Sequence, residues 1–214
     1  MAVDQPAIEV RDLVVGYGST PVLEGLTLEV PRGTATCVIG ENGAGKSTLL
    51  RTVSGLQRPE AGTVQVLGRE PGTDAEHWRQ VVTTVEPPSW YPGLTAREHA
   101  ELVTRAHGLA DGDAAAERAF ELLGLAGHED SMPTSLSSGQ KQRLTLAMAF
   151  VRPSRVLILD EPEQRLDPDA RALVAGLLRD YVTGGGTVLL ASHDEKFAAG
   201  TGALVTSVAE LCGS

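Results

Sequence analysis

The chain has 214 residues, of which 42% are hydrophobic and 21% charged, and this composition is ordinary for a globular domain. The formal net charge of −10 argues against a broad nucleic-acid-binding face, so we expect no nucleic-acid partner. The length suits one domain, with room for a subdomain and for a well-buried core.

Cysteine usage and hydropathy indicate the compartment. Cys37 and Cys212 are far apart and form no CxxC pair, so we expect reduced, cytosolic thiols and not a disulfide or a metal site. The stretch Met1–Pro6 lacks a basic region followed by an apolar core, which indicates no signal peptide. No apolar run approaches the roughly 20 residues that span a bilayer. We therefore expect a cytoplasmic protein that reaches a membrane only through a partner.

Two strand-like runs open the chain, Ile8 to Val15 and Val22 to Val30. Between them, Tyr17 lies between two glycines, which is an exposed position for an aromatic ring. Such a ring either stacks on a purine base or packs locally in its turn, and the sequence leaves both interpretations open.

A glycine-rich loop follows a short β-branched run, Thr34 to Ile39, and precedes a helix-like segment, Leu49 to Val53. The loop, Gly40 to Thr48, matches the pattern G-x-x-x-x-G-K-[ST] at every fixed position. Its glycines let backbone N–H groups converge on an anion, and the new helix adds its positive dipole end. Lys46 can reach the β- and γ-phosphates, and the Ser47 hydroxyl can ligate Mg²⁺. The predicted nucleotide-binding residues of this loop are Asn42, Gly43, Ala44, Gly45, Lys46, Ser47 and Thr48.

The middle of the chain changes from strands to helices. Gly62 to Gly68 and Val81 to Val85 are predicted strands, and Glu86 then begins a loop. Thr95 and Glu98 have capping-box spacing and predict a helix to about His107. A second helix is predicted from Asp113 to Leu123. We expect a single domain of residues 1–214, in which the core and β subdomain comprise 1–89 and 152–214 and a helical subdomain comprises 90–151.

Small polar residues from Leu136 to Gln140 precede a clear helix, Lys141 to Phe150. Hydroxyls and free N–H groups at a helix start suit an anion, although an ordinary Ser-capped helix has the same appearance. The pattern by itself does not separate the two interpretations.

Two further apolar runs, Arg155 to Leu159 and Thr187 to Ala191, lack alternation, as strands of a parallel sheet covered on both faces do. Asp160 and Glu161 end the first run, and His193 follows the second. Because ligand groups collect at the carboxyl ends of parallel strands, we expect these side chains to meet Lys46.

The charges and positions of these groups predict their roles. Asp160 can hold Mg²⁺, and Glu161 can accept a proton from an attacking water as general base. His193 is either a core histidine or a contact to the γ-phosphate that keeps the base and water in line. We therefore predict Mg²⁺-dependent hydrolysis of a nucleoside triphosphate, with Lys46, Glu161 and His193 as catalytic residues.

These motifs together resemble the ATP-binding cassette (ABC) ATPases over nearly the whole chain. The matching elements are Tyr17 for the adenine-stacking aromatic, Gly40 to Thr48 for Walker A, Leu136 to Gln140 for the signature, Val156 to Glu161 for Walker B, Leu166-Asp167 for the end of the D-loop and His193 for the switch histidine. The resemblance implies an α/β fold: a P-loop NTPase core with a mainly parallel sheet, an N-terminal antiparallel β subdomain and a helical signature subdomain.

The resemblance also implies ligands and partners. ATP and Mg²⁺ are the expected cofactors, and a second ABC ATPase subunit, identical or different, is expected to form a head-to-tail dimer. In that dimer the ATP held by one subunit would face the signature residues of the other, which are Ser137, Ser138, Gly139 and Gln140. Residues 86–95 and the helices after them would bind a separately encoded transmembrane permease. The protein would then lie peripherally at the cytoplasmic face of the membrane.

The chain departs from the family pattern at three places. Glu86 stands where a Gln is usual, and we expect it to ligate Mg²⁺ with altered metal affinity or slow hydrolysis, because it adds charge and cannot donate a hydrogen bond. Gln164 and Arg165 are bulky for a D-loop that makes a close dimer contact. Ser138 replaces a common Gly of the signature.

The leading hypothesis is the energising ATPase subunit of a membrane transporter. Tyr91 to Glu98 looks like a “YP-LT-RE” stretch common in small exporter ATPases, and no added regulatory domain follows His193, so we expect an exporter. The alternatives are a soluble ABC protein acting on translation, DNA repair or metal-cluster assembly, and a nucleotide sensor with weak or no hydrolysis.

Overall fold

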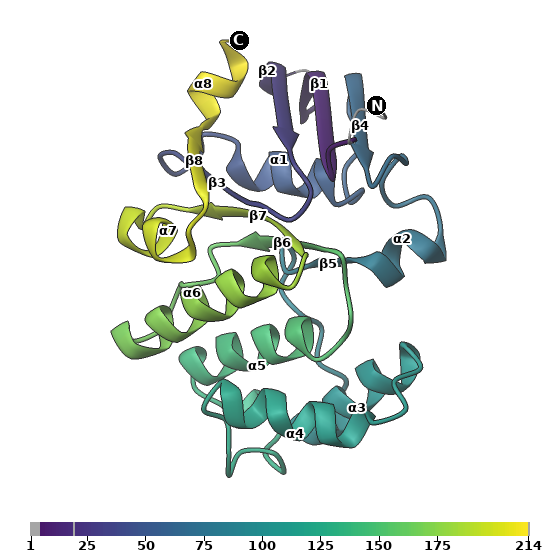
Figure 1. Cartoon of the computed structure of the whole chain (residues 1–214), viewed down its shortest axis with the longest axis vertical. Coiled ribbons are helices and arrows are strands. Elements are labelled where there is room, and N and C mark those ends of the chain that lie inside the picture. Colours follow the sequence, from purple (N-terminus) through teal and green to yellow (C-terminus); the bar gives the residue numbers. More distant parts are fainter. Residues whose placement is uncertain (1–4, 19, 214) are drawn as a thin grey trace.

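The computed structural model describes residues 5–18 and 20–213 and contains two sheets (Figure 1). Part of the Met1–Pro6 stretch therefore lies outside the described residues. The strands are β1 (Ile8–Tyr17), β2 (Thr20–Val30), β3 (Ala35–Ile39), β4 (Ala61–Val66), β5 (Val81–Thr83), β6 (Val156–Asp160), β7 (Thr187–Ser192) and β8 (Leu204–Ser207). The helices are α1 (Lys46–Val53), α2 (Ala75–Gln80), α3 (Ala96–Ala106), α4 (Gly112–Leu122), α5 (Ser138–Phe150), α6 (Pro168–Thr183), α7 (Glu195–Thr201) and α8 (Val208–Cys212), with a 3₁₀ turn at Pro133–Ser135.

The smaller sheet is antiparallel, with the strand order β2-β1-β4. Ile8 of β1 pairs with Val30 of β2 on one side and with Val66 of β4 on the other. Most of the inward side chains of these strands are completely buried. Glu9 and Glu29 are opposite each other in the strand register, on the outer face. The two N-terminal strands predicted from the sequence are confirmed, and they belong to this sheet.

The larger sheet is parallel, with the strand order β5-β6-β7-β3-β8. Successive residues of its central strands enter two different cores: Cys37 and Leu190 enter one, and Val38 and Leu189 enter the other. Because both faces are covered, most positions of such a strand are apolar, and the buried polar exceptions, such as Thr36, are small and uncharged. This double coverage explains why the strands read as uninterrupted apolar runs.

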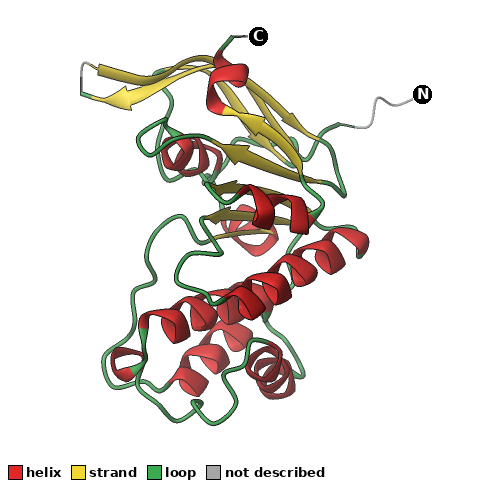
Figure 2. Cartoon of the chain, turned by 90° about the vertical axis from the view of Figure 1, so that its left-hand side faces the viewer, coloured by secondary structure: helices red, strands yellow, loops and turns green. Residues whose placement is uncertain are grey.

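Helices cover the parallel sheet in distinct layers (Figures 1 and 2). Helix α1 lies between the two sheets and contacts β1, β4, β6 and β7. Helices α6 and α7 pack on the opposite face, and α5 lies beyond α6, followed by α3 and α4. The α/β fold with an antiparallel subdomain and a helical region is thus confirmed.

Polar caps fix where the main helices begin. Thr95 and Glu98 form the predicted capping box of α3, in which each side chain bonds the backbone N–H of the other. Ser137 and Gln140 form the same arrangement at α5. Asp167 caps α6 by accepting the N–H of Ala170 at 2.8 Å. Each cap satisfies N–H groups that the first helical turn leaves free.

Several short elements were not predicted. Helix α2 and the segment β8–α8 have too few residues for a clear hydrophobic period. Strand β5 ends at Thr83 and not at Val85, because it pairs with β6 at only three positions. In the described part of the chain, no helix combines the length and the apolar character needed to cross a bilayer.

Phe120 offers a test of packing in the helical region. It is 2% exposed in the core of α4, whereas Leu122 on the same helix is 45% exposed. Phe120→Ala should lower the free energy of unfolding by about 3–5 kcal/mol, because it removes buried apolar area and leaves a cavity. Leu122→Ala, the matched control, should change it by less than about 1 kcal/mol. Urea titration measures both, and equal effects would contradict this packing.

Candidate nucleotide site

The site lies where three neighbouring parallel strands end. Strand β7 lies between β6 and β3, and all three run in the same direction. Their carboxyl ends therefore bring together the loop after β3, Asp160 at the end of β6 with Glu161 after it, and His193 after β7. This is the convergence that the sequence predicts.

The glycine loop is shaped to receive an anion. Gly45 has a φ of +96°, and a Cβ there would lie 2.5 Å from a methyl carbon of Leu23. Only glycine fits both the left-handed backbone and the close approach. Gly45 begins α1 without any side-chain cap. The N–H groups of the first turn are therefore left for a ligand, and the helix dipole favours a negative one.

Lys46 is 6% exposed and bonds its own loop. Its Nζ donates to the carbonyl oxygens of Gly40 at 2.7 Å and Glu41 at 3.0 Å. These bonds fix the ammonium group at the centre of the loop. A phosphate oxygen placed there can attract it directly.

A cavity of about 310 Å³ opens above the loop. Tyr17 lines it and is 61% exposed, which leaves its ring face free for an aromatic ligand. Ala44 does not line it and packs against the apolar core. The cavity is lined by Tyr17, Val22, Asn42, Gly43, Gly45, Lys46, Ser47, Thr48 and Glu161.

Ser47 and Asp160 form a pair of oxygen ligands. The Ser47 hydroxyl is hydrogen-bonded to the Asp160 carboxylate. Burial raises the pKa of Asp160, and this hydrogen bond and the Lys46 charge partly oppose the rise. Hydroxyl and carboxylate oxygens suit Mg²⁺, which commonly takes one or two protein ligands and completes its shell with water and phosphate oxygens. The residues present therefore fit the expected ion.

Glu161 is held beside this pair in an unusual conformation. Its φ is +44°, which is rare for a non-glycine residue and marks a strained position. Its N–H donates to the carbonyl oxygen of Ala191 at 3.0 Å, which ties it to β7. One carboxylate oxygen lies 3.2 Å from Nδ1 of His193. The structure thus brings Glu161 and His193 together.

The signature residues lie elsewhere. Ser137 and Ser138 are exposed at the start of α5, and Gly139 and Gln140 are half-buried. A Cβ on Gly139 would lie 2.9 Å from the carbonyl oxygen of Arg165, so glycine is needed there. The side chain of Gln140 also contacts Nε2 of His128 at 2.8 Å. Within one chain, none of the four lines the cavity above the glycine loop.

Glu86 is not brought to Ser47 and Asp160. Its carboxylate pairs with Nη2 of Arg51 at 2.8 Å, and it lines a separate groove between the sheet and α5. The sequence placed Glu86 at a strand end, but β5 stops at Thr83, so the chain turns before Glu86 is reached. In this structure Glu86 is paired with Arg51, and its role as a metal ligand stays a prediction.

Comparison with known proteins identifies the family. The family model described as “ABC transporter” matches residues 23–164, about two thirds of the chain. The chain belongs to the ABC transporter family. A second model, described as “AAA domain, putative AbiEii toxin, Type IV TA system”, matches residues 130–199. That shorter stretch contains the signature, Asp160, Glu161 and His193 of this ABC cassette.

Individual relatives include exporters and importers. The chain is 38% identical over 192 residues to Nod factor export ATP-binding protein I of Burkholderia orbicola (strain AU 1054), covering 87% of this chain and 62% of that protein. It is 35% identical to sulfate/thiosulfate import ATP-binding protein CysA of Mycolicibacterium paratuberculosis (strain ATCC BAA-968 / K-10), covering 88% of this chain and 53% of that protein. The chain thus spans little more than half the length of these relatives.

The fold is shared with a solved cassette described as a dimeric post-hydrolysis state bound to ADP and Pi. The TM-score is 0.81 at 22% identity, and the match covers 90% of each chain. At this identity the likeness concerns the fold.

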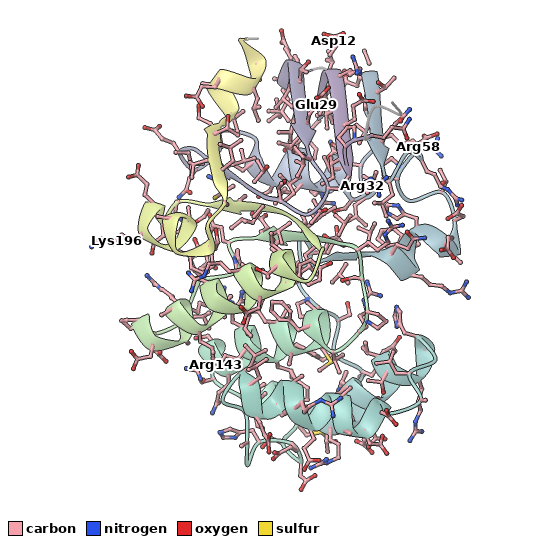
Figure 3. The ribbon with its side chains drawn as sticks, viewed as in Figure 1. Asp12, Glu29, Arg32, Arg58, Arg143 and Lys196 are labelled. Atoms are coloured by element: carbon pink, nitrogen blue, oxygen red, sulfur yellow. The ribbon has the colours of Figure 1, made fainter. Side chains whose placement is uncertain are left out.

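The ABC cassette also contains contacts that the motifs did not predict. Glu163 is 2% exposed, and Ser192 donates a hydrogen bond to its Oε1. Arg143, labelled in Figure 3, extends from α5 to the carboxylate of Asp167. Arg171 pairs with Asp194 at 3.1 Å. The only sequence signal for the contact between Glu163 and Ser192 was the unusual composition of the D-loop. No sequence motif predicts either of the two arginine pairs.

Burial raises the pKa of two titratable groups next to the site, Glu163 and Cys37. Desolvation raises the pKa of Glu163, with the Ser192 hydrogen bond opposing the rise. Desolvation, together with the charge of Glu163, raises the pKa of the Cys37 thiol to about 12. Both groups are therefore stabilised in their neutral forms.

The raised pKa of Glu163 predicts a pH-dependent stability. A raised pKa contributes stability that is complete below the ordinary glutamate pKa and is lost as pH rises through the folded value. Glu163→Gln keeps the acceptor for Ser192 but cannot ionise. The variant should therefore gain stability relative to the parent as pH rises above the ordinary glutamate pKa and through the raised pKa of Glu163. Denaturant midpoints over this range measure the difference, and a constant difference would contradict the prediction.

Proposed function

We propose that this chain is the Mg²⁺-dependent, ATP-hydrolysing nucleotide-binding subunit of a membrane transporter. The observation that carries the proposal is the contact between Glu161 and His193 at the edge of the cavity above the glycine loop. A phosphate-binding loop alone would serve a nucleotide sensor equally well. A carboxylate held beside that loop supplies the base that hydrolysis requires.

The residues divide the work of hydrolysis. Tyr17 stacks on the adenine, and the amides of α1 with Lys46 hold the phosphates. Ser47 and Asp160 would hold Mg²⁺, which would supply positive charge to offset that of the phosphates. Glu161 accepts a proton from the attacking water as its oxygen bonds the γ-phosphorus and the bond to ADP breaks, which yields ADP and phosphate. His193 contacts the γ-phosphate and keeps Glu161 in line.

A second cassette, identical or different, completes the site. Ser137 and Ser138 are exposed and lie outside the cavity of their own chain, so they are available to the ATP bound by a partner. The solved cassette of the same fold is described as dimeric. We propose that ATP binding closes such a dimer, with Gly139 and Gln140 at the same contact.

A separately encoded permease is the proposed membrane partner, and it would hold the protein at the cytoplasmic face. The groove between the sheet and α5 is lined by both apolar side chains, such as Val103 and Met148, and polar ones, such as Glu86, and we propose it as the docking surface. Export is the proposed direction. The Tyr91–Glu98 stretch and the likeness to a Nod factor export protein support it, whereas import relatives of similar identity leave import as the competing outcome.

Glu161→Gln tests the hydrolytic role. It keeps the size of the side chain but removes the base, so kcat should fall by about 100-fold or more. ATP should remain bound, and gel filtration with ATP should show a dimer. Lys46→Ala is the comparison variant, because it should lose nucleotide binding itself. Hydrolysis by Glu161→Gln at the parental rate would show that another residue is the base.

Purification from membranes tests the transporter role. A tagged chain, extracted gently, should bring down a polytopic membrane protein in a fixed ratio. In vesicles with the cassette outside, ATP should then drive cargo into the lumen if the partner exports. A chain that co-purifies only with ribosomes or other soluble assemblies would overturn the proposal, and ATP-driven loss of preloaded cargo would reverse the direction.

A further inference from the structure

The second oxygen of the proposed base has a partner of its own. Nε2 of Gln164 donates to Oε2 of Glu161 at 2.6 Å, while Oε1 lies 3.2 Å from Nδ1 of His193. The carboxylate is therefore held at both oxygens, by side chains from two different loops. Neither the glycine loop nor the metal pair makes either contact.

The local backbone explains why Gln164 points at Glu161. The N–H of Gln164 donates to the carbonyl oxygen of Glu161 at 3.0 Å, which closes a tight turn. Glu163, in the middle of this turn, points inward and is buried under Ser192. Its neighbour Gln164 is consequently directed outward, over the carboxylate. The buried anchor at Glu163 thus fixes the direction of Gln164.

Glu161, like Ser47, borders two cavities. It lines the cavity of about 310 Å³ above the glycine loop and a second one of about 480 Å³ beneath α5. Gln164 lines only the second. Its amide therefore approaches the carboxylate from the second cavity, which Ser47 and Asp160 also line, and does not enter the cavity above the glycine loop.

We propose that Gln164 is a positioning residue for the base Glu161. The inference rests on the proposed hydrolytic function and adds a residue to it. Hydrogen bonds at both oxygens fix the carboxylate plane, so that the lone pair meant for water faces the nucleotide cavity. Gln164 does not line the cavity above the glycine loop, and the hydrogen bond that links it to the site is the one to Glu161. It acts only through Glu161.

Three variants test the role. Gln164→Ala removes the donor, and Gln164→Glu keeps the shape but replaces the donor with a like charge. Both should lower kcat by about 10-fold to 100-fold, with KM for ATP unchanged, because misplacing a reacting group costs rate without costing binding. Gln65→Ala, on the remote and exposed face of β4, is the matched control and should retain parental kinetics. Thermal melting checks that all three fold.

A double-mutant cycle decides how Gln164 acts. Single-turnover rates are measured for Glu161→Gln alone and together with Gln164→Ala. If Gln164 works through Glu161, its loss should add nothing once the base is gone. An equal loss in both backgrounds, or an unchanged or faster rate for Gln164→Ala alone, would overturn the inference while leaving the hydrolytic role intact. A parental rate for Glu161→Gln alone would instead refute the base and the inference together.

Discussion

The parallel pairing of β6, β7 and β3, with both faces covered, is the constraint on which the site depends. A one-residue slip of any of these strands would move each side chain into the opposite core, so their register is strongly fixed. The interior of such a sheet has no place for a charge. The polar groups must therefore stand at the strand ends, where register alone sets their separation.

The groups that attract the nucleotide phosphates are local to the site. The chain carries a formal net charge of −10, and Asp160, Glu161 and Glu163 cluster where phosphates would bind. Burial raises the pKa of Glu163, which disfavours one of these negative charges. Backbone amides, Lys46 and a metal ion supply the attraction that the overall field does not. The Arg pairs at Glu86, Asp167 and Asp194 are partly exposed, so each adds little to stability and serves mainly to join elements.

The sequence was sufficient where local pattern decides the structure. The glycine loop, Asp160 and His193 follow buried strands with uninterrupted apolar runs, and those strands are neighbours in the sheet. The end of the strand before Glu86 was predicted two residues too late, because the extent of β5 depends on how far it pairs with β6, which its own residues do not reveal. Gln164 was expected to face a partner subunit. Its contact with Glu161 depends on a turn whose direction is set by the burial of its neighbour, and burial is a property of the folded chain.

The thiol on β3 has a consequence for chemical resilience. Cys37 lies three residues before Gly40, is completely buried and has a pKa of about 12, so at neutral pH it holds almost no thiolate. Peroxide and alkylating reagents attack the thiolate, so they react poorly with Cys37 beside the glycine loop. Cys212 is free and only half-buried. A thiol-directed reagent applied to the folded chain should therefore reach Cys212 more readily than Cys37.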